Sequence, residues 1–252
     1  MTGPAAFHRS QPRGSLRVQR TPDDEQIYQE MLSAIIEHQI MPGARLPEED
    51  LAEAFGVSRT RVRAVLQRLA HENLVTIRRN RGATVARLSA KEARDVFAAR
   101  QILEPGATEL LAERVSPRTI RSLRLFVEQE REARKTGDKR RSIALSGEFH
   151  LRLMRELNNS KLDEFLRELV SQTSLIVAVH GGTDQGSCRC EEHAELLGLI
   201  AAHDGRAAAA CMRHHLEAIE ASLQLDPDDG SASSLQEIFS RKRVRDRSGD
   251  SL

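Results

Sequence analysis

Residues Leu46 to Val85 read LPEEDLAEAFGVSRTRVRAVLQRLAHENLVTIRRNRGATV, and this stretch decides the fold of the N-terminal part of the chain. It contains two helical patterns separated by a turn at Gly56, followed by two short β-type runs around a basic turn. Glycine tolerates the left-handed backbone that a tight turn between helices requires. This order predicts a helix-turn-helix followed by a wing.

Charge and apolar spacing mark the two helices. Residues Glu48 to Asp50 place negative charge in the first turn of the first helix, where the helix dipole favours it. Ser58 is a good N-cap for the second helix. The apolar face of that second helix has helical spacing and consists of Val62, Val65, Leu66 and Leu69.

The wing is expected from the residues that follow the second helix. Residues 75–77 and 83–85 have strand-forming composition, and 78–82 form a basic turn between them. Arginines at the start of a recognition helix can bind guanine in the major groove, and a basic hairpin tip can contact phosphates or the minor groove. The residues predicted to contact duplex DNA are Arg45, Ser58, Arg59, Thr60, Arg61, Arg63, Arg79, Arg81 and Gly82.

The charge of this stretch is local. The whole chain has a net charge of only +1, yet residues 57–87 carry eight arginines and a single acid, Glu72. Phosphate neutralisation needs such a local patch and not a high net charge. The alternative is a solvated arginine-rich helix in an ordinary helical domain.

Composition and length bound the rest of the chain. A length of 252 residues favours two domains, and the absence of Trp with 3% aromatic residues favours helices packed through Leu, Ile, Val and Ala. We expect no membrane span, because no apolar run approaches the length of about 18 residues that a span needs, and no signal peptide. The three cysteines fit a reducing compartment. These features predict a cytoplasmic protein.

The expected architecture is mainly α: an N-terminal winged helix-turn-helix and a C-terminal all-α antiparallel helical bundle. The predicted divisions are a flexible arm (1–22), a DNA-binding domain (23–88), a helical domain (89–225) and a disordered tail (226–252). A helical pattern over 24–40 opens the first domain, and 88–90 is a candidate hinge. Pro105 should kink or interrupt the first helix of the bundle. Helices are expected at 90–114, 117–136, 139–157, 160–180, 190–204 and 206–224.

Three histidines in the helical half are candidate metal ligands. His150, His193 and His215 fall on three different helices, and imidazoles projecting into a bundle can bind a divalent metal such as Zn or Ni. The alternative is three histidines without a special role. Cys188 and Cys190 lie close to His193, but a structural zinc site needs a second ligand pair, which leaves Cys190 as a stand-in ligand or redox sensor at most.

Residues 42–75, PGARLPEEDLAEAFGVSRTRVRAVLQRLAHENLV, resemble the winged-helix head of GntR-type bacterial transcription factors. Two positions depart from the family pattern. Arg61 replaces the usual proline, and Glu49 stands where many members have a DNA-contacting arginine. The positions that match the pattern are Gly43, Leu46, Leu51, Ala52, Gly56, Val57, Ser58, Arg59, Thr60, Val62, Arg63, Leu66 and Leu69.

The helical half is similar to the FCD effector domain of the FadR-type branch of that family. The similarity is carried by Arg100-x-x-x-Glu104, Glu148-Phe149-His150-x-x-Leu153, Asn158, Glu192-His193 and Ala209-x-x-Met212-x-x-His215-Leu216. The resemblance implies a bundle with a central cavity for a small carboxylate, beside a metal held by His150, His193 and His215. It implies effector contacts at Arg100, Glu104, Ser146 and Asn158. Ser146 occupies the position of the usual acidic metal ligand.

The role of Arg100 has two interpretations. It can pair with an effector carboxylate, or it can form an intrahelical ion pair with Glu104 four residues later.

Together these features predict a homodimer that binds a palindromic operator. The resemblance implies a response to a small carboxylate and a repressor, as most relatives are, although some relatives are activators. An effector acts only through its different affinity for two arrangements of the protein. One alternative is a metal-dependent hydrolase that uses His150 and His193, but no catalytic partner stands at motif spacing. Another is an effector-free architectural or single-strand-binding protein, which the low aromatic content disfavours.

Overall fold

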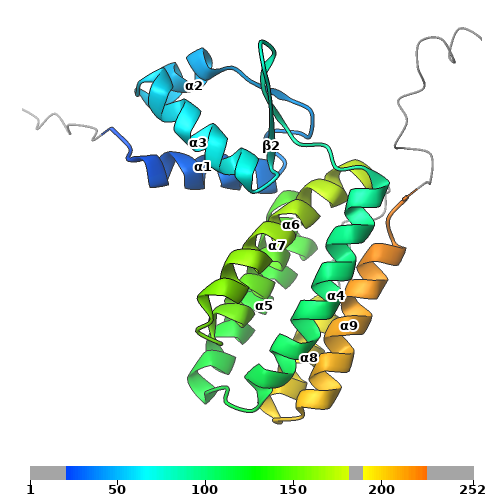
Figure 1. Ribbon diagram of the computed structural model, residues 1–252. Helices are drawn as coiled ribbons and strands as arrows, with labels where there is room; N and C mark the ends of the chain where they lie inside the picture. Colours follow the sequence, from blue (N-terminus) through cyan, green and yellow to red (C-terminus); the bar gives the residue numbers. More distant parts are fainter. Residues whose placement is uncertain (1–20, 182–189, 226–252) are drawn as a thin grey trace, which may run out of the picture.

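The computed structural model describes residues 21–181 and 190–225, which form two bodies (Figure 1). The smaller body sits on one end of an elongated helical bundle. Its elements are α1 (Asp24–Ile36), β1 (Arg45–Leu46), α2 (Glu48–Phe55), α3 (Arg59–His71), β2 (Val75–Arg78) and β3 (Gly82–Val85). The described bundle comprises α4 (Ala90–Ala112), α5 (Pro117–Lys135), α6 (Lys139–Arg155), α7 (Ser160–His180), α8 (Cys190–Ala201) and α9 (Gly205–Ala221). The mainly helical architecture predicted from the sequence is confirmed.

The predicted arm and tail fall almost entirely outside the described residues. Among those residues, no helix combines the length and apolarity that crossing a bilayer would require.

The turn between α2 and α3 forms as predicted. Gly56 ends α2 with φ 64°, in the left-handed region. Ser58 occupies the N-cap position of α3 with an extended backbone, but its side chain makes no capping hydrogen bond. The expectation that the Ser58 hydroxyl caps the helix is therefore wrong, and this exposed hydroxyl stays available for other contacts.

The wing is a three-stranded antiparallel sheet with the order β1-β3-β2. Val75 pairs with Val85 and Ile77 with Ala83 across the predicted hairpin. The third strand, β1, was not expected, because two residues are too short to show a periodic pattern. Arg45 of β1 pairs with Thr84, so the strand joins the start of the head to its wing.

The first helix is shorter than its apolar pattern suggested. It ends at Ile36 instead of Ile40, because the chain turns at His38, which has φ 54°. The His38 Nε2 atom lies 2.9 Å from the Ser174 carbonyl oxygen, and Ser174 Oγ donates to the Ile36 carbonyl oxygen at 2.7 Å. These contacts attach the end of α1 to α7.

Capping side chains set the starts of the bundle helices. Ser89 and Glu92 form a capping box at α4, and Ser116 with Pro117 opens α5. Most starts match the sequence prediction, whereas predicted ends run up to three residues too far. The last predicted turns lead into left-handed residues such as Asn158 (φ 51°) and His203 (φ 58°), which cannot continue a helix.

Pro105 does not interrupt α4, so the interruption that was one of the two expected effects is not observed. The helix runs from Ala90 to Ala112 with the proline inside it. Proline removes one backbone hydrogen bond, but packing holds α4 on both sides of this point: α4 lies against α9 along the bundle (Figure 1). The Gln101 side chain also donates to Glu220 of α9 at 2.9 Å.

The two bodies share one apolar core. Phe97 of α4 and Leu175 and Ile176 of α7 are fully buried in the cluster that also holds the core of the head. Leu88, in the expected hinge, is buried, and its carbonyl oxygen lies 2.8 Å from Nε2 of His180. The structure therefore fixes this linker by packing and hydrogen bonding, which differs from the free hinge expected.

Candidate functional site

The recognition helix α3 buries its apolar face and presents arginines to solvent. Val62, Leu66 and Leu69 are buried, whereas the side chains of Arg59 and Arg63 are 61% and 56% exposed. Thr60 is exposed beside them. The helix thus has the form expected of one that enters a DNA groove with its N-terminal residues.

Glu48 of α2 holds the recognition arginines in the DNA-free chain. Its carboxylate accepts two hydrogen bonds from Arg63, at 2.8 Å from Nε and 2.6 Å from Nη2. Nη2 of Arg59 lies 4.0 Å from the same carboxylate. The hydrogen bond from Arg63 lowers the pKa of Glu48, so the acid stays ionised. This carboxylate occupies donors that a phosphate or a base edge would use.

Arg61 faces α1 and not the open side of α3. Its Nε donates to Asp24 Oδ1 at 2.5 Å, and its Nη2 donates to the Pro22 carbonyl oxygen at 2.7 Å. Its side chain is only 35% exposed. The arginine that replaces the usual proline therefore anchors the start of α1, and its predicted DNA contact competes with this role.

The remaining predicted DNA contacts lie on the sheet side of the head. Arg79, Arg81 and Gly82 are exposed at the tip of the β2–β3 hairpin, and Arg45 is exposed on β1. Gly82 has φ 80°, a conformation that glycine adopts without strain and that closes the hairpin. The basic tip is thus free of the apolar core and available to a phosphate backbone.

We expect Glu48→Gln to bind DNA more tightly, by about threefold to tenfold, because a neutral amide keeps only one acceptor for Arg63, holds it without charge and removes one negative charge near the phosphates. Anisotropy titrations with operator and random duplexes at several salt concentrations measure this change. Glu49→Gln is the matched control, since it makes the same charge change in the same helical turn. Weaker binding by Glu48→Gln alone would mean that the carboxylate positions Arg63 for DNA.

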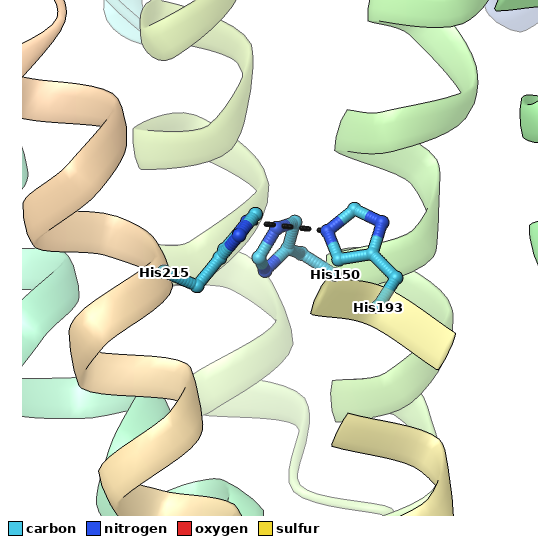
Figure 2. A group of neighbouring side chains, drawn as sticks. All are labelled: His150, His193 and His215. Carbon is cyan, nitrogen blue, oxygen red and sulfur yellow. Dashed lines mark hydrogen bonds between the residues drawn. The ribbon is translucent and has the colours of Figure 1, made fainter. Parts of the chain in front are cut away.

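The bundle brings the three predicted histidines together. His150 of α6, His193 of α8 and His215 of α9 are buried, and one ligand atom from each lies within 4.8 Å of the others. Figure 2 shows the three rings turned toward one another from separate helices. The Nε2 atoms of His193 and His215 are 3.1 Å apart. Two nitrogens bonded to one zinc ion at about 2.0–2.1 Å have a similar separation.

Each ring is oriented by a carboxylate at its other nitrogen. Nδ1 of His150 lies 2.6 Å from Glu104 Oε2. The Glu130 carboxylate lies 2.8 Å from Nδ1 of His193, and the Glu192 carboxylate lies 2.7 Å from Nδ1 of His215. A carboxylate can only accept, so the proton of each neutral ring belongs on Nδ1 and the lone pair on Nε2. Metal-binding histidines commonly have such partners.

The electrostatics favour neutral rings. Burial lowers the pKa of His215 to about 3, and burial likewise lowers the pKa of His150. The Nε2 atoms of His193 and His215 lie 3.1 Å apart, close enough for both to bond one metal ion when their protons are on Nδ1. The donor set therefore fits a divalent metal.

Arg100 is a buried cation next to this cluster. It is 2% exposed, and its Nε donates to Glu104 Oε1 at 2.5 Å, which is the intrahelical pair anticipated from the sequence. Its Nη1 donates to Thr173 Oγ1 at 3.0 Å. Its Nη2 has no hydrogen-bond partner within the described residues. Burial alone would raise the pKa of Glu104, but the charges and hydrogen bonds of Arg100 and His150 together outweigh burial and hold that pKa well below its usual range.

A cavity of about 160 Å³ opens beside Arg100 and His150. Arg100 and Ser146, two predicted effector contacts, line it. Glu104 lies behind these residues and holds Arg100 and His150 in place. Asn158 is exposed in the turn between α6 and α7, away from the cavity lining, so its position does not support an effector contact.

Sequence reasoning missed the carboxylate partners of the histidines. Glu130 lies on α5, and Glu192 pairs with His215 on another helix instead of with its neighbour His193. Both pairings depend on how helices face each other, and no spacing along the chain reveals that. Cys188 lies outside the described residues, as does the side chain of Cys190.

A winged helix-turn-helix head on a helical body with an internal cavity defines a DNA-binding regulator. Residues 24–85 match the model of bacterial regulatory proteins of the gntR family, and residues 95–218 match that of the FCD domain. The chain belongs to the GntR family and carries an FCD domain. The matching families and relatives are transcriptional regulators and not enzymes, which removes the hydrolase alternative.

Similar proteins support this assignment. The Uxu operon transcriptional regulator of Escherichia coli is 28% identical over 75% of this chain and 82% of its own length. The transcriptional repressor RspR of Escherichia coli is 26% identical over 81% of this chain and 90% of its own. The solved structure of Escherichia coli McbR shares the fold with a TM-score of 0.72 at 23% identity, over 79% of this chain and 95% of the other.

Proposed function

We propose that this protein is a dimeric repressor whose operator affinity changes when a small carboxylate enters the helical body. The observation that carries the effector part is the buried Arg100, whose Nη2 lacks a partner among the described residues and which lines the cavity beside His150. A buried cation with unmade hydrogen bonds is costly, and a carboxylate supplies the missing acceptor in a charge-assisted bond. The similarity to RspR, a transcriptional repressor of Escherichia coli, supports the direction of regulation.

The proposed DNA complex follows from the fold. Helix-turn-helix proteins commonly bind as two-fold dimers on half-sites about one helical turn apart, so each protomer places one α3 in one half-site. Such a regulator works in the cytoplasm, where bacterial DNA lies. Because Leu88 and Phe97 are buried between the two bodies, a change in the bundle reaches the head through packed side chains.

We further propose that His150, His193 and His215 hold a divalent ion, zinc or nickel. Two observations support this metal site: the three rings converge, and a carboxylate lies at the Nδ1 atom of each ring. Ser146 lines the cavity where the family has an acidic ligand, so a water or the effector would complete the coordination. The bound ion would supply positive charge that, with Arg100, holds a carboxylate.

The metal proposal predicts that His215→Gln loses tight binding of zinc or nickel, because one of three nitrogen donors disappears. In the wild type, metal at one hundred times its Kd should raise the free energy of unfolding by about 2.7 kcal/mol. Calorimetric titration of the demetallated chain and denaturation with and without metal measure both effects. His214→Gln is the matched control, since His214 is exposed on the same helix. Equal metal binding by the two variants would exclude the cluster.

Footprinting on the promoter region next to the protein's own coding sequence tests the regulatory function. We expect protection of one palindromic site in the presence of excess random DNA, and a change in protection when small carboxylates are added. Diffuse coverage that competes equally with random DNA would instead support an architectural protein.

A further inference from the structure

The cavity is charged at one end and apolar toward the other. The lining residues lie on successive turns of two helices. On α6 they run from His150 to Ile143, and on α7 they run from Val170 to Val177. Arg100 joins His150 at the charged end. A ligand that places an anion at Arg100 must therefore place the rest of its atoms among apolar side chains.

We propose that the effector is a monocarboxylate with a short apolar tail, branched aliphatic or aromatic, and that the tail reaches the DNA-binding head. This inference rests on the proposed effector site. It adds the chemical nature of the part of the effector that is attached to the carboxylate. The apolar side chains that surround the tail position are Ile36, Ile143, Val177, Ile219 and Leu223.

Three of the five hydroxyl groups in the lining already donate to backbone carbonyl oxygens, which disfavours a polyhydroxylated acid. Ser174 Oγ donates to the Ile36 carbonyl oxygen, Thr173 Oγ1 to that of Leu169 and Ser222 Oγ to that of Ile219. These donors are already committed to the backbone. Several ligand hydroxyls placed in this part of the cavity would lose their hydrogen bonds to water without gaining equivalent partners. Each such hydroxyl would reduce the free energy of binding.

The size of the cavity limits the tail. A dry protein cavity of about 150 Å³ accommodates one benzene ring, and this cavity measures about 160 Å³. The volume thus suits an acid with a tail of a few carbon atoms or a single ring. A long acyl chain or a sugar-sized acid exceeds it.

The far end of the cavity touches the head directly. Ile36 is the last residue of α1, and it lines the cavity although it belongs to the DNA-binding body. The hydrogen bond from Ser174 to the Ile36 carbonyl lies at the same place. An apolar tail that extends to Ile36 therefore contacts the junction between the two bodies.

Calorimetric titration of the metal-loaded full chain with three acids tests the proposal: 3-methylbutanoate, acetate and gluconate. We expect 3-methylbutanoate to bind at least about tenfold tighter than acetate, because each methylene in an apolar pocket is worth about tenfold or more. Gluconate should bind more weakly than 3-methylbutanoate. Gluconate binding more tightly, through Arg100, would overturn the apolar-tail inference and leave the proposed carboxylate effector intact. Binding of none of the acids would overturn both.

A near-isosteric pair of variants locates the tail. Val177→Thr keeps the shape of the side chain but adds a hydroxyl to the cavity wall, and should weaken 3-methylbutanoate severalfold with little change for acetate. Val127→Thr, at a buried valine of α5 outside the lining, controls for general destabilisation. Equal effects of the two substitutions would place the tail elsewhere and overturn the proposal.

Methyl NMR of isoleucine-labelled protein tests contact with the head. The Ile36 methyl signal, assigned with Ile36→Val, should shift with saturating 3-methylbutanoate but not with acetate. Ile27, fully buried on the same helix, is the reference signal. An unshifted Ile36 signal at saturation would mean that the tail does not reach the head.

Discussion

A variant carrying Arg59→Ala and Arg63→Ala loses specific operator binding. Each arginine that bonds a guanine through two hydrogen bonds contributes about 1–3 kcal/mol of discrimination. Both side chains are more than half exposed at the start of α3 and have no role in the apolar core. Since both lie near Glu48, their effects need not add fully, and we expect a loss of at least about thirtyfold.

Anisotropy titrations at constant salt with the footprinted operator and a scrambled duplex measure this loss. The control is Arg121→Ala with Arg124→Ala, which removes two exposed arginines of α5 in the bundle. Binding to scrambled DNA should fall much less than binding to the operator, because phosphate contacts from the wing remain. Unchanged operator affinity in the α3 variant would show that another surface reads the sequence.

Arg100→Ala destabilises the folded protein by about 3–5 kcal/mol, because it leaves a buried carboxylate without its cation. Glu104 has no solvent exposure, and its Oε1 accepts from Arg100. Since a folded domain has only about 5–15 kcal/mol of stability, the loss is severe. Urea denaturation followed by circular dichroism measures it.

Two further variants show whether the buried charge causes this loss. Glu104→Gln in the Arg100→Ala background removes the unpaired charge and should recover part of the stability. Lys91→Ala breaks an exposed pair with Asp95 on the same helix and should cost at most about 1 kcal/mol. If Arg100→Ala were as stable as wild type, the carboxylate would have another adequate partner.

The same pair predicts a dependence on pH. The folded-state pKa of Glu104 is lowered, so the stabilisation from its ionised form is present above the ordinary glutamate pKa of about 4.3 and is lost as pH falls toward the folded-state value. The stability difference between wild type and Arg100→Ala should therefore shrink below about pH 4.

Local signals explain why much of the fold was predictable. The turn glycine Gly56, the capping residues Ser89 and Ser116 and the apolar spacing of α3 each act within a few residues of the chain. Such signals specify where a helix starts and which face it buries. They also placed His150, His193 and His215 on separate helices.

Contacts between distant segments were not predictable in the same way. The bond from Arg61 to Asp24, the strand β1 and the carboxylate partners Glu130 and Glu192 depend on how finished elements face one another. Asn158 shows a different limit of prediction from sequence. The family pattern suggested an effector contact, whereas its left-handed backbone and exposure give it a place in a turn.

The core shared by Phe97, Leu175 and Ile176 with the head has a practical consequence for dissecting this protein. Cleavage at Leu88 would uncover aromatic and aliphatic side chains on both fragments at once, and such surfaces aggregate. We therefore expect head and bundle to unfold together in a single thermal transition, and separately expressed halves to be poor substitutes for the intact chain.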